Sequence, residues 1–468
     1  MLGAGLSPGA RESLSVDPRE VCDVSHQSSP NRKTTDAAAA TGSRLDSYVD
    51  RYATRTHGMT ASEVRSLFAV ASRPEVVSLA GGMPNISGLP LDVVGSLVHE
   101  LVDKRGMTAL QYGSGQGDPT LREQICEVMR PVGIAAHPDD VTVTVGSQQA
   151  LDLVTRIFID PGDVILAEAP SYVGALGTFR SYQANVVHVE MDDDGLVPAR
   201  LREAIATVRA SGSAIKFLYT IPSYHNPAGV TLTPQRRAEI LEICRHADVL
   251  VIEDDPYGLL GFDGEVPRAL RADDAEQVIY LGSFSKTFAP GFRVGWALAP
   301  HAVREKLVLA AENSVLCPPA FSQLAVSDYL AGHDWLAQVK DFREAYRERR
   351  DAMLESLDDL MPAGAQWTKP TGGFYVWLTL PEGIDAKAML PRAVTNRVAY
   401  VPGTAFFADG FGSRSMRLSY CYPTPERIRE GVRRLAQVIE QEMELRATFG
   451  AWAATRRPGL DGPAPDQS

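Results

Sequence analysis

A lysine that closely follows a predicted strand is the residue of this sequence best placed to act as a nucleophile. Residues 280–286 read YLGSFSK, an apolar strand that ends at Gly282 and is followed by two serines and Lys286. A charged ammonium within a largely apolar stretch is costly, so such a lysine either extends to solvent or has a lowered pKa and reacts as an amine. The segment alone leaves open a surface lysine in a serine-rich turn.

Phosphate-binding groups surround this lysine in the sequence. Ser283 and Ser285 precede it, and Arg293 follows it within the stretch PGFRVGW. Hydroxyls, a guanidinium and backbone amides at a strand end form a phosphate cup. A nucleophilic lysine beside a phosphate cup suggests pyridoxal 5′-phosphate (PLP), whose aldehyde forms an imine with lysine.

A second buried strand ends in acids. Residues 251–257 read VIEDDPY. A carboxylate here can pair with the protonated pyridine nitrogen of PLP and keep the ring an electron sink, and Tyr257 can hydrogen-bond the phenolic oxygen. Strand alternation does not say which of Asp254 and Asp255 faces the ring. A solvated acidic turn with a packed tyrosine is the alternative.

Three further junctions carry polar or aromatic groups. Asn226, in an Asn-Pro turn, could donate to the same phenolic oxygen, and the amides of Ser147 and Gln148 open a helix whose N-terminus attracts phosphate. Tyr172 could place its ring against the cofactor. Each has a simpler alternative, which is a turn, an N-cap or a core residue. We expect His225 to be structural or exposed in a loop.

These positions follow apolar strands that alternate with helical patterns. The seven predicted strands are residues 141–145, 164–167, 186–189, 215–220, 249–253, 278–282 and 293–298. Such alternation indicates an α/β fold with a mostly parallel sheet covered on both faces, which binds ligands at the carboxyl ends of its strands.

Beyond about Leu330 the pattern changes. A long charged helix is predicted over 335–360, then strands around 374–378 and 416–420, and a helix over 425–443. This order predicts a second, smaller α+β lobe.

Composition excludes several function classes. The 468 residues carry 46 Lys and Arg against 58 Asp and Glu, a net charge of −12, which argues against a nucleic-acid partner but permits a locally positive pocket for a small anion. The 5 cysteines show no CxxC spacing, so we expect neither a disulfide framework nor a metal site. No apolar run approaches the roughly 20 residues of a membrane span, and no secretory signal is evident. We therefore expect a soluble protein of more than one domain in the reducing cytoplasm, with no membrane partner.

Together the segments resemble the class I aminotransferases, which are fold-type I PLP enzymes. The resemblance runs from about Arg65 to Val438, with motifs in the family's order at residues 78–84, 111–113, 146–148, 170–172, 226–229, 254–257, 283–286, 293, 370–374, 401–403 and 416–418. It implies a large domain with a mostly parallel seven-stranded sheet and a smaller α+β domain. The expected boundaries are a disordered leader (1–44), an N-terminal segment joining the small domain (45–91), the large PLP-binding domain (92–330), the small domain (331–445) and a flexible tail (446–468).

The resemblance also implies roles for single residues around the ring. Lys286 would hold the cofactor as an imine and later move the α-proton as a general base. Asp254, by its Asp-x-x-Tyr spacing, would pair with the ring nitrogen. Tyr257 and Asn226 would hold the phenolic oxygen, and Tyr172 would stack on the ring.

Further implied roles concern the phosphate and the substrate. The phosphate ligands would be donor groups of Ser147, Gln148, Ser283, Ser285 and Arg293. Arg417 would take the substrate α-carboxylate as a bidentate pair, with Gly82 and Asn226 also at the substrate. Tyr112 would reach the phosphate of the other subunit, which implies a homodimer.

The spacing of residues 62–65 before 79–84 resembles the 2-aminoadipate and kynurenine aminotransferase branch. There, a mobile N-terminal arginine can meet a distal substrate carboxylate, a role that Arg65 would take for donors such as glutamate or 2-aminoadipate. Members of the branch also accept apolar substrates. The predicted function is transfer of an amino group from an amino acid to a 2-oxo acid.

Two alternatives remain open at this point. A β-lyase or decarboxylase would use the same Lys286, Asp254 and Arg417. A transcriptional regulator with an aminotransferase-like domain would need a basic DNA-binding module, which residues 1–60 do not suggest.

Overall fold

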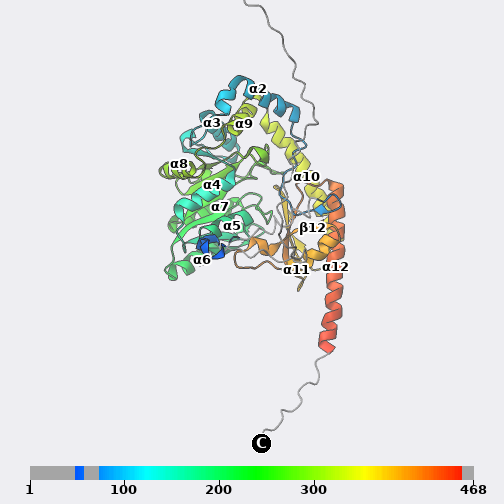
Figure 1. The fold of residues 1–468 in the computed structure, drawn as a ribbon. Coiled ribbons are helices and arrows are strands. Elements are labelled where there is room, and N and C mark those ends of the chain that lie inside the picture. The colour runs from blue at the N-terminus through cyan, green and yellow to red at the C-terminus, as the bar shows by residue number, and fades with distance from the viewer. Residues whose placement is uncertain (1–47, 57–58, 60–72, 456–468) are drawn as a thin grey trace, which may run out of the picture. The chain divides into compact units, whose positions relative to one another are not determined.

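The computed structural model describes residues 48–56, 59 and 73–455 (Figure 1). Residues Ala53–Ser468 form one unit, and Met1–Tyr52 form another, of which the short helix η1 (Val49–Arg51) is described. The predicted leader and Arg65 lie outside the described residues. The sheets and the cavity described next belong to the unit that starts at Ala53.

Eight described strands form the larger sheet, in the order β2-β9-β8-β7-β6-β3-β4-β5. Their bounds are β2 (Val141–Thr144), β3 (Val164–Ala169), β4 (Asn185–Asp192), β5 (Gly195–Leu196), β6 (Ile215–Thr220), β7 (Leu250–Asp254), β8 (Val278–Ser283) and β9 (Gly295–Leu298). The run from β8 through β7, β6 and β3 to β4 is parallel, whereas β9 pairs antiparallel with both β8 and β2.

All seven predicted strands are present in this sheet. The predicted count of seven omits β5, a two-residue strand that pairs antiparallel with β4 at the sheet edge. The last predicted strand begins at Gly295 instead of Arg293, because Arg293 has a left-handed backbone (φ 54°) that ends the short helix before it.

Apolar side chains cover both faces of this sheet. Phe217 and Tyr219 of β6 belong to one buried cluster, and Leu218 between them belongs to another. Since neighbouring strand residues point to opposite faces, helices must pack on both. These helices are α3 (Pro119–Met129), α4 (Ser147–Phe158), α5 (Val173–Ser181), α6 (Pro198–Ala210), α7 (Pro234–His246) and α8 (His301–Val315), joined by α2 (Leu91–Ala109) and α9 (Ala320–Gly332).

Among the described residues, the smaller lobe contains a four-stranded antiparallel sheet and three helices. Its elements are β10 (Gln366–Trp367), β11 (Tyr375–Thr379), β14 (Ser415–Ser419) and β13 (Val401–Pro402), in that order, with α10 (Trp335–Leu360), α11 (Ala386–Thr395) and α12 (Pro425–Thr455). Helix α10 has its predicted bounds, since Asp334 accepts a hydrogen bond from the Ala337 amide as its N-cap. Helix α12 starts at Pro425 as predicted and continues past residue 446, where we expected a flexible tail.

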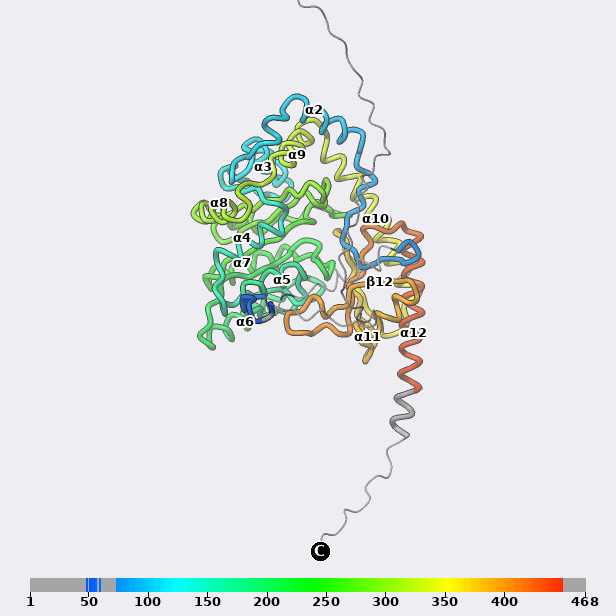
Figure 2. Tube along the Cα trace, viewed as in Figure 1, coloured from blue at the N-terminus to red at the C-terminus, as the bar shows by residue number. Residues whose placement is uncertain are grey.

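The segment before α2 runs beside the smaller lobe (Figure 2). Strand β1 (Val77–Ser78) pairs in parallel with β12 (Val398–Ala399). Short 3-10 helices complete the described elements: η2 (Thr54–Thr56), η3 (Arg130–Val132), η4 (Pro138–Asp140), η5 (Leu270–Ala272), η6 (Pro290–Phe292) and η7 (Gly403–Phe406). Among the described residues, no helix combines the length and apolar character that crossing a bilayer requires.

Candidate active site

A cavity of about 310 Å³ lies where the carboxyl ends of the parallel strands meet. Asp254 ends β7, and Tyr172, Ile221 and Lys286 come one to three residues after the ends of β3, β6 and β8. The lining residues are Gly82, Ser147, Tyr172, Val173, Gly174, Ile221, Asn226, Asp254, Pro256, Tyr257, Lys286, Tyr375 and Arg417. Most of the predicted site residues therefore share one cavity.

The amine of Lys286 points into this cavity. Its Nζ donates to the carbonyl oxygen of Gly82 at 2.8 Å and lies 5.5 Å from the ring centre of Phe374. Burial lowers the pKa of Lys286 to about 8; Cys421 opposes this shift, and the charge of Arg417 adds to it. Lowering the pKa raises the share of unprotonated amine at neutral pH, and this is the form that reacts with a carbonyl carbon.

The carboxylate of Asp254 has one free oxygen in the cavity wall. Its Oδ2 accepts a hydrogen bond from the Tyr219 hydroxyl at 2.8 Å, whereas its buried Oδ1 has no partner among the residues that the structure describes. Burial raises the pKa of Asp254 to about 7, although the Tyr219 hydrogen bond opposes the shift. A cationic N–H donor beside Oδ1 would satisfy this oxygen and favour the ionised carboxylate. The protonated nitrogen of a pyridine ring fits that requirement.

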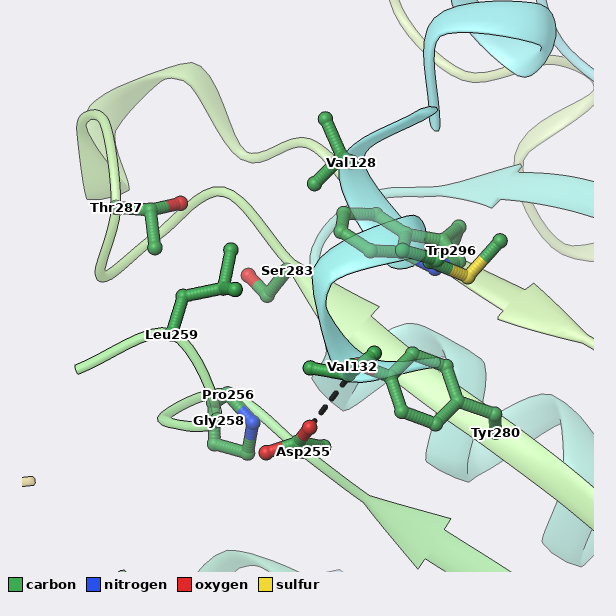
Figure 3. A pocket seen from close by; sticks show the side chains of 11 residues that line it. Val128, Val132, Asp255, Pro256, Gly258, Leu259, Tyr280, Ser283, Thr287 and Trp296 are labelled. Carbon is green, nitrogen blue, oxygen red and sulfur yellow. Dashed lines mark hydrogen bonds between the residues drawn. The ribbon is translucent and has the colours of Figure 1, made fainter. Parts of the chain in front are cut away.

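The neighbouring Asp255 faces a different, smaller cavity (Figure 3). This second cavity is about 20 Å³, close to the size of one water molecule, and Asp255 Oδ2 accepts there from the Tyr280 hydroxyl at 3.1 Å. The two acids thus point to opposite sides of the chain. Asp254 is the one at the larger cavity, which strand alternation alone did not decide.

A cluster of donors lies beside Ser147 at the N-terminus of α4. Arg293 donates from Nη1 to Ser285 Oγ at 3.3 Å and from Nη2 to the Val145 carbonyl at 3.2 Å, and Ser283 Oγ donates to Ser285 Oγ at 2.9 Å. A Cβ on Gly146 (φ 76°) would collide with the Arg293 guanidinium, so glycine is required there. The first amides of a helix lack intrahelical acceptors and attract phosphate.

These donors differ in which cavity they reach. Ser147 lines the larger cavity, whereas Ser283 lines the smaller one. The side chain of Gln148 donates to Thr178 Oγ1 at 2.9 Å, which leaves its backbone amide as the group for a phosphate.

The guanidinium of Arg417 is buried on the opposite wall, on β14. Its Nη1 donates to Asn226 Oδ1 at 2.9 Å and its Nη2 to the Ala80 carbonyl at 2.8 Å, while Nε has no partner in the described part of the chain. The rings of Tyr375 and Phe406 lie 4.2 and 5.1 Å from its central carbon. A buried cation of this kind is suited to a substrate carboxylate.

Two tyrosines, Tyr172 and Tyr257, complete the wall of this cavity. Tyr172 donates to Gln148 Oε1 at 3.3 Å, and Tyr257 donates to the Tyr375 hydroxyl at 3.5 Å. Burial raises the pKa of Tyr172 to about 12 and that of Tyr257 well above its ordinary value. Both therefore remain protonated hydrogen-bond donors.

Other predicted residues lie elsewhere. Tyr112 is 77% exposed and is not among the residues that line the cavity. Of the two alternatives for His225, a structural role or exposure in a loop, the structure shows the first: the side chain is buried, its Nε2 lies 3.0 Å from Glu168, and its Nδ1 accepts from the Ala228 amide. It therefore supports the turn that carries Asn226.

The sequence patterns indicate no role for Tyr375, Phe374 or Phe406. The first two follow the Pro-Thr-Gly-Gly motif at 370–373, but nothing in the motif shows what they face. The pairing of β11 with β14 is what places Tyr375 at this site. Trp377 of β11 is opposite Arg417 of β14, so Tyr375 is the diagonal neighbour of Arg417.

Comparisons with known proteins find relatives over most of the chain. A family model described as aminotransferase class I and II matches residues 77–435. The "Aromatic-amino-acid aminotransferase 1" of Thermococcus litoralis is 44% identical over 400 residues, which cover 85% of this chain and 96% of that protein. The "2-aminoadipate transaminase" of Thermus thermophilus is 36% identical over 82% of this chain and 95% of its own length.

A solved structure extends the likeness to three dimensions. The kynurenine aminotransferase of Pyrococcus horikoshii, crystallised in complex with PMP, superimposes with a TM-score of 0.81 at 40% identity. The match covers 84% of this chain and 98% of that chain.

Proposed function

This chain belongs to the class I and II aminotransferases, and from that premise we propose that it binds pyridoxal 5′-phosphate at Lys286. The observation that carries the proposal is the larger cavity itself. It combines a lysine whose pKa is lowered to about 8, a buried carboxylate oxygen without a partner and a buried guanidinium. PLP, once bound, supplies an electron sink for the charge that develops at the substrate α-carbon.

The residues of the chain then have distinct tasks toward the cofactor. Asp254 holds the ring nitrogen through Oδ1, and Tyr257 donates to the phenolic oxygen together with the amide nitrogen of Asn226. Arg293, Ser285 and the α4 amides hold the phosphate, with Ser283 supporting Ser285. Tyr172 packs against the ring. These contacts orient the ring so that Lys286 Nζ can reach the substrate.

Two groups act on the substrate. Arg417 binds the α-carboxylate of the amino acid. Lys286 Nζ takes the proton from the α-carbon and would deliver it to the cofactor carbon that carries the amino nitrogen. The Gly82 carbonyl, which now accepts from Lys286, borders the same space. We propose that the amino group passes in this way from an amino acid to a 2-oxo acid such as 2-oxoglutarate.

The cavity wall also bears on the choice of amino donor. Val173, Ile221 and the ring of Tyr375 are apolar, and Arg417 is the one guanidinium among the described lining residues. We propose that aromatic and apolar donors fit this wall, and that a dicarboxylic donor needs Arg65 for its distal carboxylate. The names of the relatives, which concern aromatic amino acids and 2-aminoadipate, support both classes.

A donor panel tests the proposed function. The holoenzyme is assayed with aromatic, apolar and dicarboxylic amino acids against 2-oxoglutarate, and kcat/KM is compared. We expect formation of the matching 2-oxo acid and glutamate. Release of ammonia and pyruvate from a β-substituted amino acid, without glutamate formation, would instead identify a β-lyase.

Replacing Arg65 by alanine is expected to lower kcat/KM for glutamate and 2-aminoadipate by about tenfold or more, since a charge-assisted contact contributes roughly 1.5–3 kcal/mol. Apolar donors should change by less than about twofold, because they offer Arg65 no anion. Arg73→Ala, at an exposed position of the same N-terminal segment, is the matched control. Equal losses for both donor classes would reject the role of Arg65.

We further propose that two copies form a homodimer in the cytoplasm. Tyr112 closely follows two other exposed side chains in the sequence, Met107 and Leu110, which are 89% and 73% exposed. Covering such residues by a second subunit would remove apolar surface from water and bring Tyr112 to the partner's site. Sedimentation of the holoenzyme should give twice the mass of the chain, and a monomeric holoenzyme with full activity would contradict the dimer.

A further inference from the structure

We propose that Tyr375 is a positioning residue of this site: its hydroxyl supports the hydroxyl of Tyr257, and its ring supports the guanidinium of Arg417. The inference rests on the proposed function, because both partners act there on the bound cofactor and substrate. Tyr375, at the start of β11, would then link two groups of the site. Tyr257 holds the phenolic oxygen of the cofactor, and Arg417 holds the carboxylate of the substrate.

The hydroxyl of Tyr375 has a partner inside the cavity. Tyr375 is 2% exposed, and Tyr257 donates to its oxygen at 3.5 Å. The two rings meet edge to face, with centres 6.1 Å apart at 88°. When Tyr257 turns its proton to an acceptor in the cavity, Tyr375 still has a proton to donate to the Tyr257 oxygen. Hydrogen bonds in a chain polarise one another, so Tyr257 becomes the stronger donor.

The ring of Tyr375 meets Arg417 face on. The guanidinium carbon lies 4.2 Å from the ring centre, closer than the 5.1 Å to Phe406. Since β11 and β14 pair with Trp377 opposite Arg417, the sheet fixes this contact through the backbone. A cation held against an aromatic face away from water is well stabilised.

The third contact is with the backbone that anchors Lys286. A Cβ on Gly82 would collide with the Tyr375 hydroxyl, so the absence of a side chain at Gly82 is what admits this oxygen. The carbonyl of the same residue accepts the hydrogen bond from Lys286 Nζ. Apolar packing alone would be served by phenylalanine, so the hydroxyl is the feature that requires a functional explanation.

The test separates the hydroxyl from the ring. In holoenzyme carrying Tyr375→Phe, the pH at which the absorbance of bound PLP changes is expected to rise by about 0.5 unit. The reason is that Tyr257 then donates more weakly to the phenolic oxygen and stabilises its anionic form less. KM for the amino acid should stay within about twofold, because the ring on Arg417 remains. Tyr400→Phe is the matched control, since it removes another buried hydroxyl, which donates to the Ala386 carbonyl, away from the cavity.

A second variant tests the ring. Tyr375→Leu is expected to raise KM for the amino acid about tenfold beyond Tyr375→Phe, because Arg417 loses an aromatic face. A Tyr375→Phe holoenzyme whose absorbance titrates as in the wild type and Tyr400→Phe would overturn the role of the hydroxyl. Equal KM values for the two Tyr375 variants would overturn the role of the ring. A wild-type protein that gains no visible absorbance with PLP would instead reject the proposed function.

Discussion

Replacing Lys286 by alanine is expected to remove the visible absorbance of bound PLP and to lower amino transfer by at least about 10⁴-fold. The structure gives the reason: Nζ is the amine that reaches the cavity, and the pKa of Lys286 is lowered to about 8 because burial disfavours its ammonium form. The variant loses both the covalent attachment and the group that moves the α-proton. Absorbance spectra and single-turnover rates measure the two losses separately.

The control for this variant is Lys340→Ala, on the exposed face of α10. It should keep the absorbance and the transfer rate of the wild type. Thermal unfolding of the cofactor-free proteins should show that Lys286→Ala still folds, since removing a partly desolvated cation costs little stability. Full activity in Lys286→Ala would show that another group carries out the chemistry.

Replacing Asp254 by asparagine is expected to lower kcat by about 10²–10³-fold, which is typical for the loss of a preorganised charge. An asparagine whose carbonyl accepts from Tyr219 would present its NH₂ group where Asp254 Oδ1 now lies. That group cannot accept a hydrogen bond from a protonated ring nitrogen, so the ring loses the charge that keeps it an electron sink. Rates at saturating substrate and PLP measure the effect.

The adjacent Asp255→Asn is the matched control. Asp255 accepts from Tyr280 in the smaller cavity and does not line the larger one, so we expect a change in kcat below about threefold. The two variants, Asp254→Asn and Asp255→Asn, alter adjacent positions and make the same chemical change. Similar losses of kcat in both variants would mean that the two carboxylates matter because they stabilise the fold, and not because one of them pairs with the ring nitrogen.

The sequence predicts the strands around this site well, because residues that act in it lie at or shortly after the ends of those strands. Each of the seven predicted strands is present, and β3, β6, β7 and β8 are parallel, so the residues after them converge at one edge. Lys286, Asp254 and Asn226 could therefore be placed together from their positions alone. The two-residue strand β5 was beyond prediction, because it carries no periodic pattern of its own.

The rest of the site depends on contacts between distant segments. Tyr375 meets Arg417 only through the register of β11 on β14, and Gly82 meets Lys286 across more than two hundred positions. His225 is buried because Glu168, at the end of β3, lies beside the turn that follows β6. Such pairings depend on tertiary packing, which local residue types do not encode.

A half-reaction tests most directly whether this site moves an amino group by way of Lys286. The holoenzyme is mixed with an excess of an amino acid donor and no 2-oxo acid, and absorbance, 2-oxo acid and ammonia are measured. We predict conversion of bound PLP to its aminated form with one equivalent of 2-oxo acid per site, reversed on adding 2-oxoglutarate. Continued release of ammonia, with PLP unchanged and no aminated cofactor formed, would contradict amino transfer at this site.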